Sequence, residues 1–189
     1  MTESPKYHLV KKYGEFEIRE YAGYIKTEVD ITGRDYKAAV ESGFRVLAGY
    51  IFGDNFAREK IEMTTPVQAT RSQKIAMTTP VTISGEGQYS VAFIMPSEYT
   101  LESLPMPKDS RIRFTPVASH QVAAILFSGY FNQSRIQKSK ERLRQWVEEQ
   151  GLETEGDFIV AGYNPPWVPG FLARNEVLIK IKTLVTVEK

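Results

Sequence analysis

The chain has no cysteine among its 189 residues, and this single absence excludes several kinds of site. Without a thiol it can form no disulfide, no thiolate metal site and no cysteine nucleophile. Histidine is nearly as scarce, because only His8 and His120 are present. The two imidazoles offer no catalytic dyad, because nothing in the sequence pairs either of them with a partner.

Charge of one sign and long apolar runs are also lacking. Lys and Arg number 24 against 23 for Asp and Glu, which leaves a net charge of +1 and no electrostatic reason to expect nucleic acid or an anionic membrane as a partner. The first twelve residues contain no apolar core of a signal peptide, and no stretch of about 18 apolar residues occurs. We therefore expect a cytoplasmic protein with a small-molecule partner, and the sequence leaves its oligomeric state open.

Motifs that carry catalysis are missing too. The sequence contains no Gly-x-Ser-x-Gly, no His-Glu-x-x-His and no phosphate-binding loop. An enzyme needs a nucleophile or a general base that a neighbouring side chain holds in place, and no pair of residues in the sequence offers one. We therefore expect no catalytic residues and a binding protein rather than an enzyme.

The most informative feature that is present is a phrase written twice. KIEMTTPV occupies residues 60–67 and KIAMTTPV occupies residues 74–81, so that Met63 and Met77 lie 14 residues apart at equivalent positions. Six polar or small residues separate the copies, which predicts two similar extended segments with a solvated connection. Two copies are too few for a repeat array, since such arrays need about three units. The duplication is therefore a local feature of a larger fold.

The hydrophobic pattern predicts a simple order of elements. Alternation over residues 15–31 predicts two strands with a turn at Ala22-Gly23, and further strands are predicted over residues 88–95, on both sides of a turn at 119–120 within 111–127, and over 158–163 and 177–187. A first helix is predicted from Asp35 to Gly53, with the apolar face Tyr36, Val40, Phe44, Leu47 and Ile51. A second helix is predicted over residues 132–150.

This order reads as one unit repeated. A strand, strand, helix, strand, strand unit occupies about residues 13–95 and again about 111–187, after a leader of residues 1–12. Composition fits a single globular domain, with 42% hydrophobic and 25% charged residues. We therefore predict one α+β domain over residues 13–187, built on an antiparallel sheet of about eight strands that closes or nearly closes into a barrel.

Four stretches together resemble the SOUL haem-binding protein family. They are the doubled phrase, SVAFIMPSEY, PVASHQVAAILFSGY and AGYNPPWVPGFLARNEVLIKI, and the resemblance runs from about Tyr13 to Lys182. It implies a distorted antiparallel β-barrel with two helices and a pseudo-twofold internal duplication. It also implies non-covalent binding of haem or other tetrapyrroles. The same architecture is similar to effector domains of bacterial transcription regulators, which bind hydrophobic ligands.

The resemblance implies a hydrophobic cleft beside the first helix and the methionine-containing segment that follows it. Basic residues there are candidates for binding the two propionates of a porphyrin, or they are solvated strand ends. An apolar helical face also serves the core, so we expect only part of it to reach a ligand. The candidate cofactor-binding residues are Val40, Phe44, Leu47, Arg58, Lys60, Ile61, Met63, Lys74 and Met77.

Iron ligation has weaker support than porphyrin binding. Methionine can ligate haem iron, but Met63 and Met77 fit packing roles equally well. His8 falls in the leader, and His120 falls in a turn where no neighbour is expected to orient its ring. We therefore expect weak binding of haem or iron-free porphyrin without a metal ligand, in a carrier or buffer. The alternatives are a ligand-sensing module for another planar hydrophobic molecule, and a structural fold without a ligand.

Overall fold

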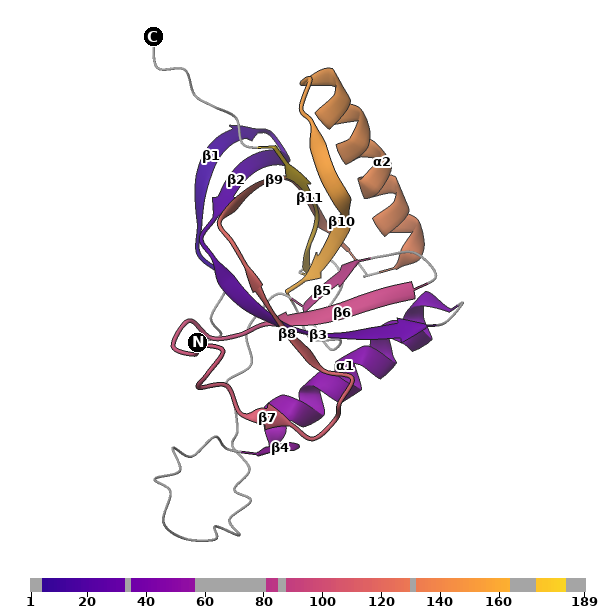
Figure 1. Ribbon diagram of the computed structural model, residues 1–189. Coiled ribbons are helices and arrows are strands. Elements are labelled where there is room, and N and C mark those ends of the chain that lie inside the picture. The colour runs from indigo at the N-terminus through magenta and orange to yellow at the C-terminus, as the bar shows by residue number, and fades with distance from the viewer. Residues whose placement is uncertain are drawn as a thin grey trace, which may run out of the picture.

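The structure is a computed structural model that describes residues 5–32, 35–56, 81–84, 88–129, 132–163 and 173–182. A strongly curled sheet forms its centre, and two helices lie against the outside of the curl (Figure 1). Within the described residues, neither helix is long and apolar enough to cross a membrane. The repeated phrase lies outside the described residues except for Val81, which begins a strand.

Nine strands form the main sheet, in the order β1-β2-β9-β11-β10-β5-β6-β3-β8, and every neighbouring pair is antiparallel. A separate two-stranded ladder joins β4 to β7. The α+β prediction is confirmed. The elements are β1 (Tyr7–Tyr13), β2 (Phe16–Tyr21), β3 (Tyr24–Thr32), α1 (Tyr36–Phe52), β4 (Asn55–Phe56), β5 (Val81–Ser84), β6 (Gln88–Ile94), β7 (Met106–Pro107), β8 (Arg113–Val117), β9 (His120–Ser128), α2 (Gln133–Glu149), β10 (Thr154–Gly162) and β11 (Arg174–Ile181).

Strand β1 corrects one expectation. Residues 7–12, which we assigned to a leader, form most of this edge strand, and His8 lies opposite Glu20 of β2. Six of the seven β1 residues are exposed, so the strand has no alternation between buried and exposed positions that would reveal it in the sequence. The strand is held in place by its antiparallel pairing with β2.

Helix α1 forms where the sequence predicts it, because both of its ends are capped. The Asp35 carboxylate accepts a hydrogen bond from the Ala38 amide at 2.7 Å, and Gly53 ends the helix with a φ of 126°. Its buried face contacts β3 and β6. Gly43 lies at the closest approach, since a Cβ there would stand 2.6 Å from Cγ2 of Val91.

Helix α2 is the counterpart of α1 in the second half of the chain. The Asn132 side chain accepts a hydrogen bond from the Arg135 amide at 3.0 Å, which caps the first turn. Leu143, Trp146 and Val147 pack against strands β9, β10 and β11. The Trp146 ring stacks on Phe16 of β2 with the ring centroids 4.9 Å apart.

The sheet order displays the predicted internal duplication. The units β2-β3-α1-β5-β6 and β8-β9-α2-β10-β11 meet at the β5–β10 pair, and outward from it β6 corresponds to β11 and β3 to β9. The first strand of each unit is exchanged, because β2 pairs with β9 and β8 pairs with β3. The strands on either side of Ala22-Gly23 therefore do not pair with each other, and the two halves interlock.

The two faces of the curled sheet are covered differently. On the outer face, α1 covers a core that includes Val29, Val91 and Phe93, and α2 covers a second core that includes Ile18 and Ile125. A third, smaller cluster lies on the concave face, formed by Tyr21, Val122, Ala124, Ala161 and Leu178. No helix among the described elements covers this inner face, so its side chains border a hollow.

Candidate ligand-binding sites

Three of the nine predicted cofactor-binding residues lie in the described part of the chain. Val40, Phe44 and Leu47 are all on α1. For the other six, the expectation stays a prediction, because they lie outside the described residues: Arg58, Lys60, Ile61, Met63, Lys74 and Met77.

The three helical residues have unequal access to a ligand. Leu47 has no exposed surface and belongs to the core under α1, and Val40 is partly buried against the same core. Phe44 is 38% exposed, and its ring meets Phe93 edge to face with the centroids 5.4 Å apart. Of the three, Phe44 therefore offers the largest apolar surface to a bound molecule.

Further exposed apolar side chains continue from Phe44 toward the C-terminal end of α1. Phe52 follows Phe44 by eight residues with Ala48 midway, and residues four apart lie on one flank of a helix. Phe56 of β4 pairs with Met106 of β7, close to that end. Phe52, Phe56 and Met106 are 58%, 40% and 54% exposed. We name Phe44, Phe52, Phe56 and Met106 the α1 apolar surface.

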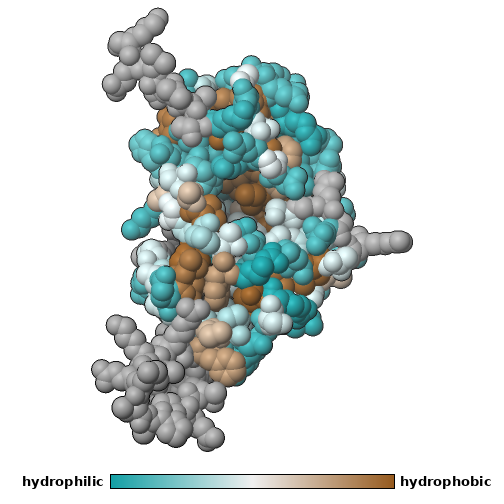
Figure 2. All heavy atoms as spheres, in the orientation of Figure 1, coloured by the Kyte–Doolittle hydropathy of each residue, from teal (hydrophilic) through white to brown (hydrophobic). Residues whose placement is uncertain are grey.

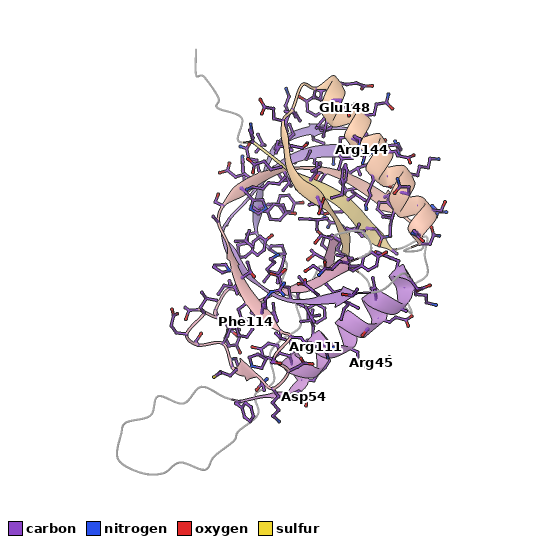
Figure 3. The ribbon with its side chains drawn as sticks, turned by 45° about the vertical axis from the view of Figure 1, so that its right-hand side comes forward. Arg45, Asp54, Arg111, Phe114, Arg144 and Glu148 are labelled. Carbon is purple, nitrogen blue, oxygen red and sulfur yellow. The ribbon has the colours of Figure 1, made fainter. Side chains whose placement is uncertain are left out.

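Two cations accompany the α1 apolar surface. The Lys108 ammonium lies 5.4 Å from the centre of the Phe56 ring, and the exposed Arg45 is the neighbour of Phe44 along α1 (Figure 3). Sequence reasoning missed Phe52, although its spacing of eight from Phe44 along α1 signalled it, and it missed Phe56, which follows the helix end at Gly53 and lies on β4. It could not find Met106 or Lys108, because only the pairing of β4 with β7 brings them beside Phe56.

A second candidate site is the hollow inside the curled sheet. Its volume is about 240 Å³, and the side chains around it come from both halves of the chain, including Tyr21, Tyr24, His120, Tyr163 and Leu178. Figure 2 shows a hollow near the middle of the molecule with hydrophobic residues at its bottom. The lining is mainly apolar with a few polar groups, as ligand pockets generally are.

A buried ion-pair network adjoins this hollow. The fully buried Arg19 donates two hydrogen bonds to Glu176, at 2.7 and 3.0 Å, and a third to Glu17 at 2.7 Å. Arg174 also donates to Glu176, at 2.7 Å, and the Tyr163 hydroxyl donates to it at 2.8 Å. The network therefore fixes Tyr163, a wall of the hollow, to β11.

The network also sets the ionisation of its members. Burial by itself would raise the pKa of Glu176, but the hydrogen bonds and charge of Arg19, with the hydrogen bonds from Arg174 and Tyr163, outweigh it and lower that pKa. Burial raises the pKa of Tyr163, and the Glu176 charge adds to the effect. Glu176 is thus a carboxylate and Tyr163 a neutral phenol near neutral pH.

Glu28 is the acidic residue on the wall of the hollow. Its carboxylate accepts hydrogen bonds from Lys26 at 2.6 Å, Thr115 at 2.5 Å and Ser90 at 3.2 Å. Burial would raise the pKa of Glu28, but these donors outweigh it and lower the pKa. Its charge is paired with Lys26, so the carboxylate is already engaged on several sides.

His120 corrects a second expectation. It begins strand β9 and lines the hollow, and its Nδ1 lies 2.8 Å from the carbonyl oxygen of Ala118. Its ring also stacks on Tyr21, with the planes 16° apart and the centroids 5.8 Å apart. A backbone carbonyl and a tyrosine therefore orient a ring that we expected to find without an orienting neighbour.

Two other features of the described residues complete the picture. A groove of about 640 Å³ runs between α2 and β10, lined by charges of both signs that include Arg144 and Glu148 (Figure 3). Within the described part of the chain, no group of three or more His, Asp or Glu side chains is placed to hold a metal ion. Neither feature offers the apolar contact area that the hollow and the α1 apolar surface provide.

Comparison with known proteins agrees with the fold and gives the family. The C-terminal domain of EcmrR superposes with a TM-score of 0.65 over 89% of this chain and 98% of that domain, and at 9% identity this shows a shared fold alone. Heme-binding protein 2 of Homo sapiens is 29% identical over 161 residues, 81% of this chain and 72% of its own. Heme-binding protein 1 of Xenopus laevis is 27% identical over 166 residues, 86% of this chain and 81% of its own. The model of the SOUL heme-binding protein family matches residues 2–180, and the chain therefore belongs to that family.

Proposed function

We propose that this chain binds haem or iron-free porphyrin non-covalently, beside α1, as a carrier or buffer of tetrapyrrole. The observation that carries the proposal is membership of the SOUL family over nearly the whole chain. The relatives named above are heme-binding proteins, and their match covers most of this chain.

The described residues fit a porphyrin in their chemistry. A porphyrin has two flat apolar faces and two carboxylates, and the α1 apolar surface offers three phenylalanines and a methionine, with Lys108 and Arg45 nearby. Aromatic side chains supply large contact areas, and ammonium and guanidinium groups suit carboxylates. The hollow, at about 240 Å³, falls below the 300 to 1,000 Å³ of pockets for drug-sized ligands, so it does not suit a tetrapyrrole.

The residues outside the described part complete this proposal as the sequence suggests it. Arg58, Lys60 and Lys74 are proposed to meet the propionates, and Ile61, Met63 and Met77 to pack against the ring. When bound, haem would supply a planar hydrophobic ring and an iron centre. We propose that contact with the ring, rather than a bond to the iron, provides the affinity.

Titrations with haemin and with protoporphyrin, followed by the Soret band, test the proposal. We expect saturable one-to-one binding of both molecules. Phe52→Ala should weaken the affinity for both molecules about tenfold, because loss of the ring removes about 1.5 kcal/mol or more of apolar contact. Met63→Leu and Met77→Leu should change the protoporphyrin affinity little, since Leu conserves the volume of Met.

Leu9→Ala is the matched control. Leu9 is as exposed as Phe56, but it lies on β1 at one edge of the main sheet, whereas α1 packs on β3 and β6 toward the other edge. Its removal should therefore leave both affinities unchanged. Absence of saturation below tens of micromolar would refute porphyrin binding. A haemin spectrum altered by only one of the methionine variants would instead identify that methionine as an iron ligand.

A second candidate function is recognition of a smaller planar molecule. The hollow in the curled sheet favours it, because the hollow lies on the concave face and α1 packs on the outer face, so the two candidate sites do not overlap. This function does not require porphyrin binding.

A further inference from the structure

The size of the hollow restricts what it can hold. A dry cavity of about 150 Å³ in a protein core is known to hold one benzene molecule. At about 240 Å³, the hollow has room for a substituted benzene or for two fused rings. Small side chains make this space, since Ala92 of β6 and Ala161 of β10 both line it.

The charges around the hollow restrict its ligand further. Lys26 is paired with Glu28, and Lys180 lies 2.9 Å from Glu155. The Glu28 carboxylate also accepts from Thr115 and Ser90, so it is not available to balance the charge of a ligand. A buried cation or anion without a partner is costly, and therefore a neutral molecule suits the hollow.

Among the polar groups of the hollow, His120 carries an acceptor that its described neighbours leave open. The Tyr163 hydroxyl donates to Glu176, and the Tyr21 hydroxyl accepts from Arg19 at 3.3 Å. At His120, the Ala118 carbonyl can only accept, so in the neutral ring the proton lies on Nδ1. Nε2 is then an acceptor, and it has no hydrogen-bond partner among the described residues.

Aromatic rings next to His120 add apolar walls beside this acceptor. Tyr21 stacks on the imidazole, and the Tyr24 ring lies 6.0 Å from it at an angle of 58°. Ala161 and Leu178 add apolar surface on the β10 and β11 side. The hollow thus combines flat apolar walls with an acceptor on an oriented ring, and apolar walls with a few placed polar groups are the usual composition of a specific small-molecule site.

We propose that the hollow is a binding site for a neutral aromatic molecule of one or two rings, whose hydroxyl or ring N–H donates a hydrogen bond to Nε2 of His120. The tyrosine and aliphatic side chains contact the faces of the ligand, and His120 selects its polar edge. The proposal deepens the second candidate function above and is independent of porphyrin binding at α1.

Calorimetric titration with three probes of similar size tests the proposal. 2-Naphthol carries the donor, 2-methoxynaphthalene lacks it, and phenyltrimethylammonium carries a positive charge. We expect 2-naphthol to bind best, 2-methoxynaphthalene about tenfold more weakly, and the cation not measurably. Equal binding of 2-naphthol and 2-methoxynaphthalene, or tighter binding of the cation, would overturn the assignment.

Two variants locate the site. His120→Phe keeps a ring but loses the acceptor, so it should weaken 2-naphthol about tenfold and leave 2-methoxynaphthalene unchanged. Ala92→Leu fills the hollow and should abolish binding of both, with the thermal unfolding midpoint as the check on folding. If 2-naphthol binds equally well to the wild-type chain and to the folded Ala92→Leu variant, the hollow is not the site.

The two proposed functions fail separately. Phe52→Ala should leave 2-naphthol binding unchanged, and Ala92→Leu should leave haemin binding unchanged. Loss of 2-naphthol binding in Phe52→Ala would contradict a site in the hollow. Binding of 2-naphthol by a chain that does not bind haemin would refute the first proposed function and support this one.

Discussion

At the scale of single residues, the network around Arg19 brings three buried charged side chains together in the interior. Taking a guanidinium and two carboxylates out of water is unfavourable unless hydrogen bonds satisfy them, and here Arg19, Glu17 and Glu176 satisfy each other. The guanidinium also lies 4.4 Å from the centre of the Tyr7 ring, which covers it. The network ties β2 to β11 across β9, and it borders the hollow.

Glu176→Gln should therefore destabilise the fold by about 3 kcal/mol at pH 7, because it leaves a buried guanidinium with one remaining carboxylate. The pH dependence should change as well. The folded-state pKa of Glu176 is lowered, so its stabilising contribution is present above the ordinary glutamate pKa of about 4.3 and is lost as pH falls through the folded value.

Urea unfolding between pH 7 and pH 3 measures this effect. Wild-type stability should fall below about pH 4.3, and the fall should be smaller in Glu176→Gln. Glu155→Gln is the control, because the exposed pair of Glu155 with Lys180 should contribute little at any pH. If Glu176→Gln loses as much stability between pH 7 and pH 3 as the wild type does, the assigned role of Glu176 is contradicted.

At the scale of elements, α1 shows how one helix serves two purposes. Its buried face, with Leu47 and Ile51, holds the core against β3 and β6, while Phe44 and Phe52 leave an apolar flank in solvent. The helix approaches the sheet closely because Gly43 has no side chain where Val91 packs. Glycine elsewhere in α1 has no such function, and this contrast can be tested.

Gly43→Ala should destabilise the fold by about 1–2 kcal/mol. Alanine favours a helix over glycine by about 1 kcal/mol, but the new Cβ would stand 2.6 and 2.8 Å from the stiff side chain of Val91, and overpacking costs more. Gly49→Ala is the matched control, because its Cβ would meet only the movable carboxylate of Asp54. Gly49→Ala should leave stability equal or higher in urea unfolding, and the same result for Gly43→Ala would contradict the close contact.

At the scale of the whole molecule, the exchanged strands join the two halves into one unit. β2 of the first half completes the sheet beside β9, and β8 of the second half completes it beside β3. The hollow belongs to neither half alone, since Tyr24 and His120 come from different halves. A site at this position requires the duplicated fold as a whole.

The two halves should therefore unfold together in a single transition. Far-UV circular dichroism follows both sets of strands, and fluorescence follows Trp146 and Trp167, which both belong to the second half of the sequence. We expect coincident urea midpoints for the two signals, because cross-half pairs couple the halves. A fluorescence midpoint clearly separated from the dichroism midpoint would show halves that unfold independently.

The sequence allowed prediction where local physics decides the outcome. Asp35, Gly53 and Asn132 mark helix ends through capping, and alternation marks β6 and β9, so these elements lie where they were predicted. β1 escaped prediction because its residues are almost uniformly exposed. Phe44 was predicted beside a ligand and is exposed, whereas Leu47 from the same helical stripe is buried, because the sequence does not show which part of the apolar stripe faces the sheet.

By itself, the sequence determined the α+β class, the repeated unit, both helices and the family resemblance, since capping, periodicity and motif order are all properties of neighbouring residues. Only the tertiary structure decided that the halves exchange their first strands and that Met106 and Lys108 lie beside Phe56 of β4, the strand that follows α1. It also decided that Ala118 orients His120 in a hollow beside Tyr21 and Tyr24. These facts depend on pairing between strands far apart in the chain, and no local pattern encodes which distant strands will pair.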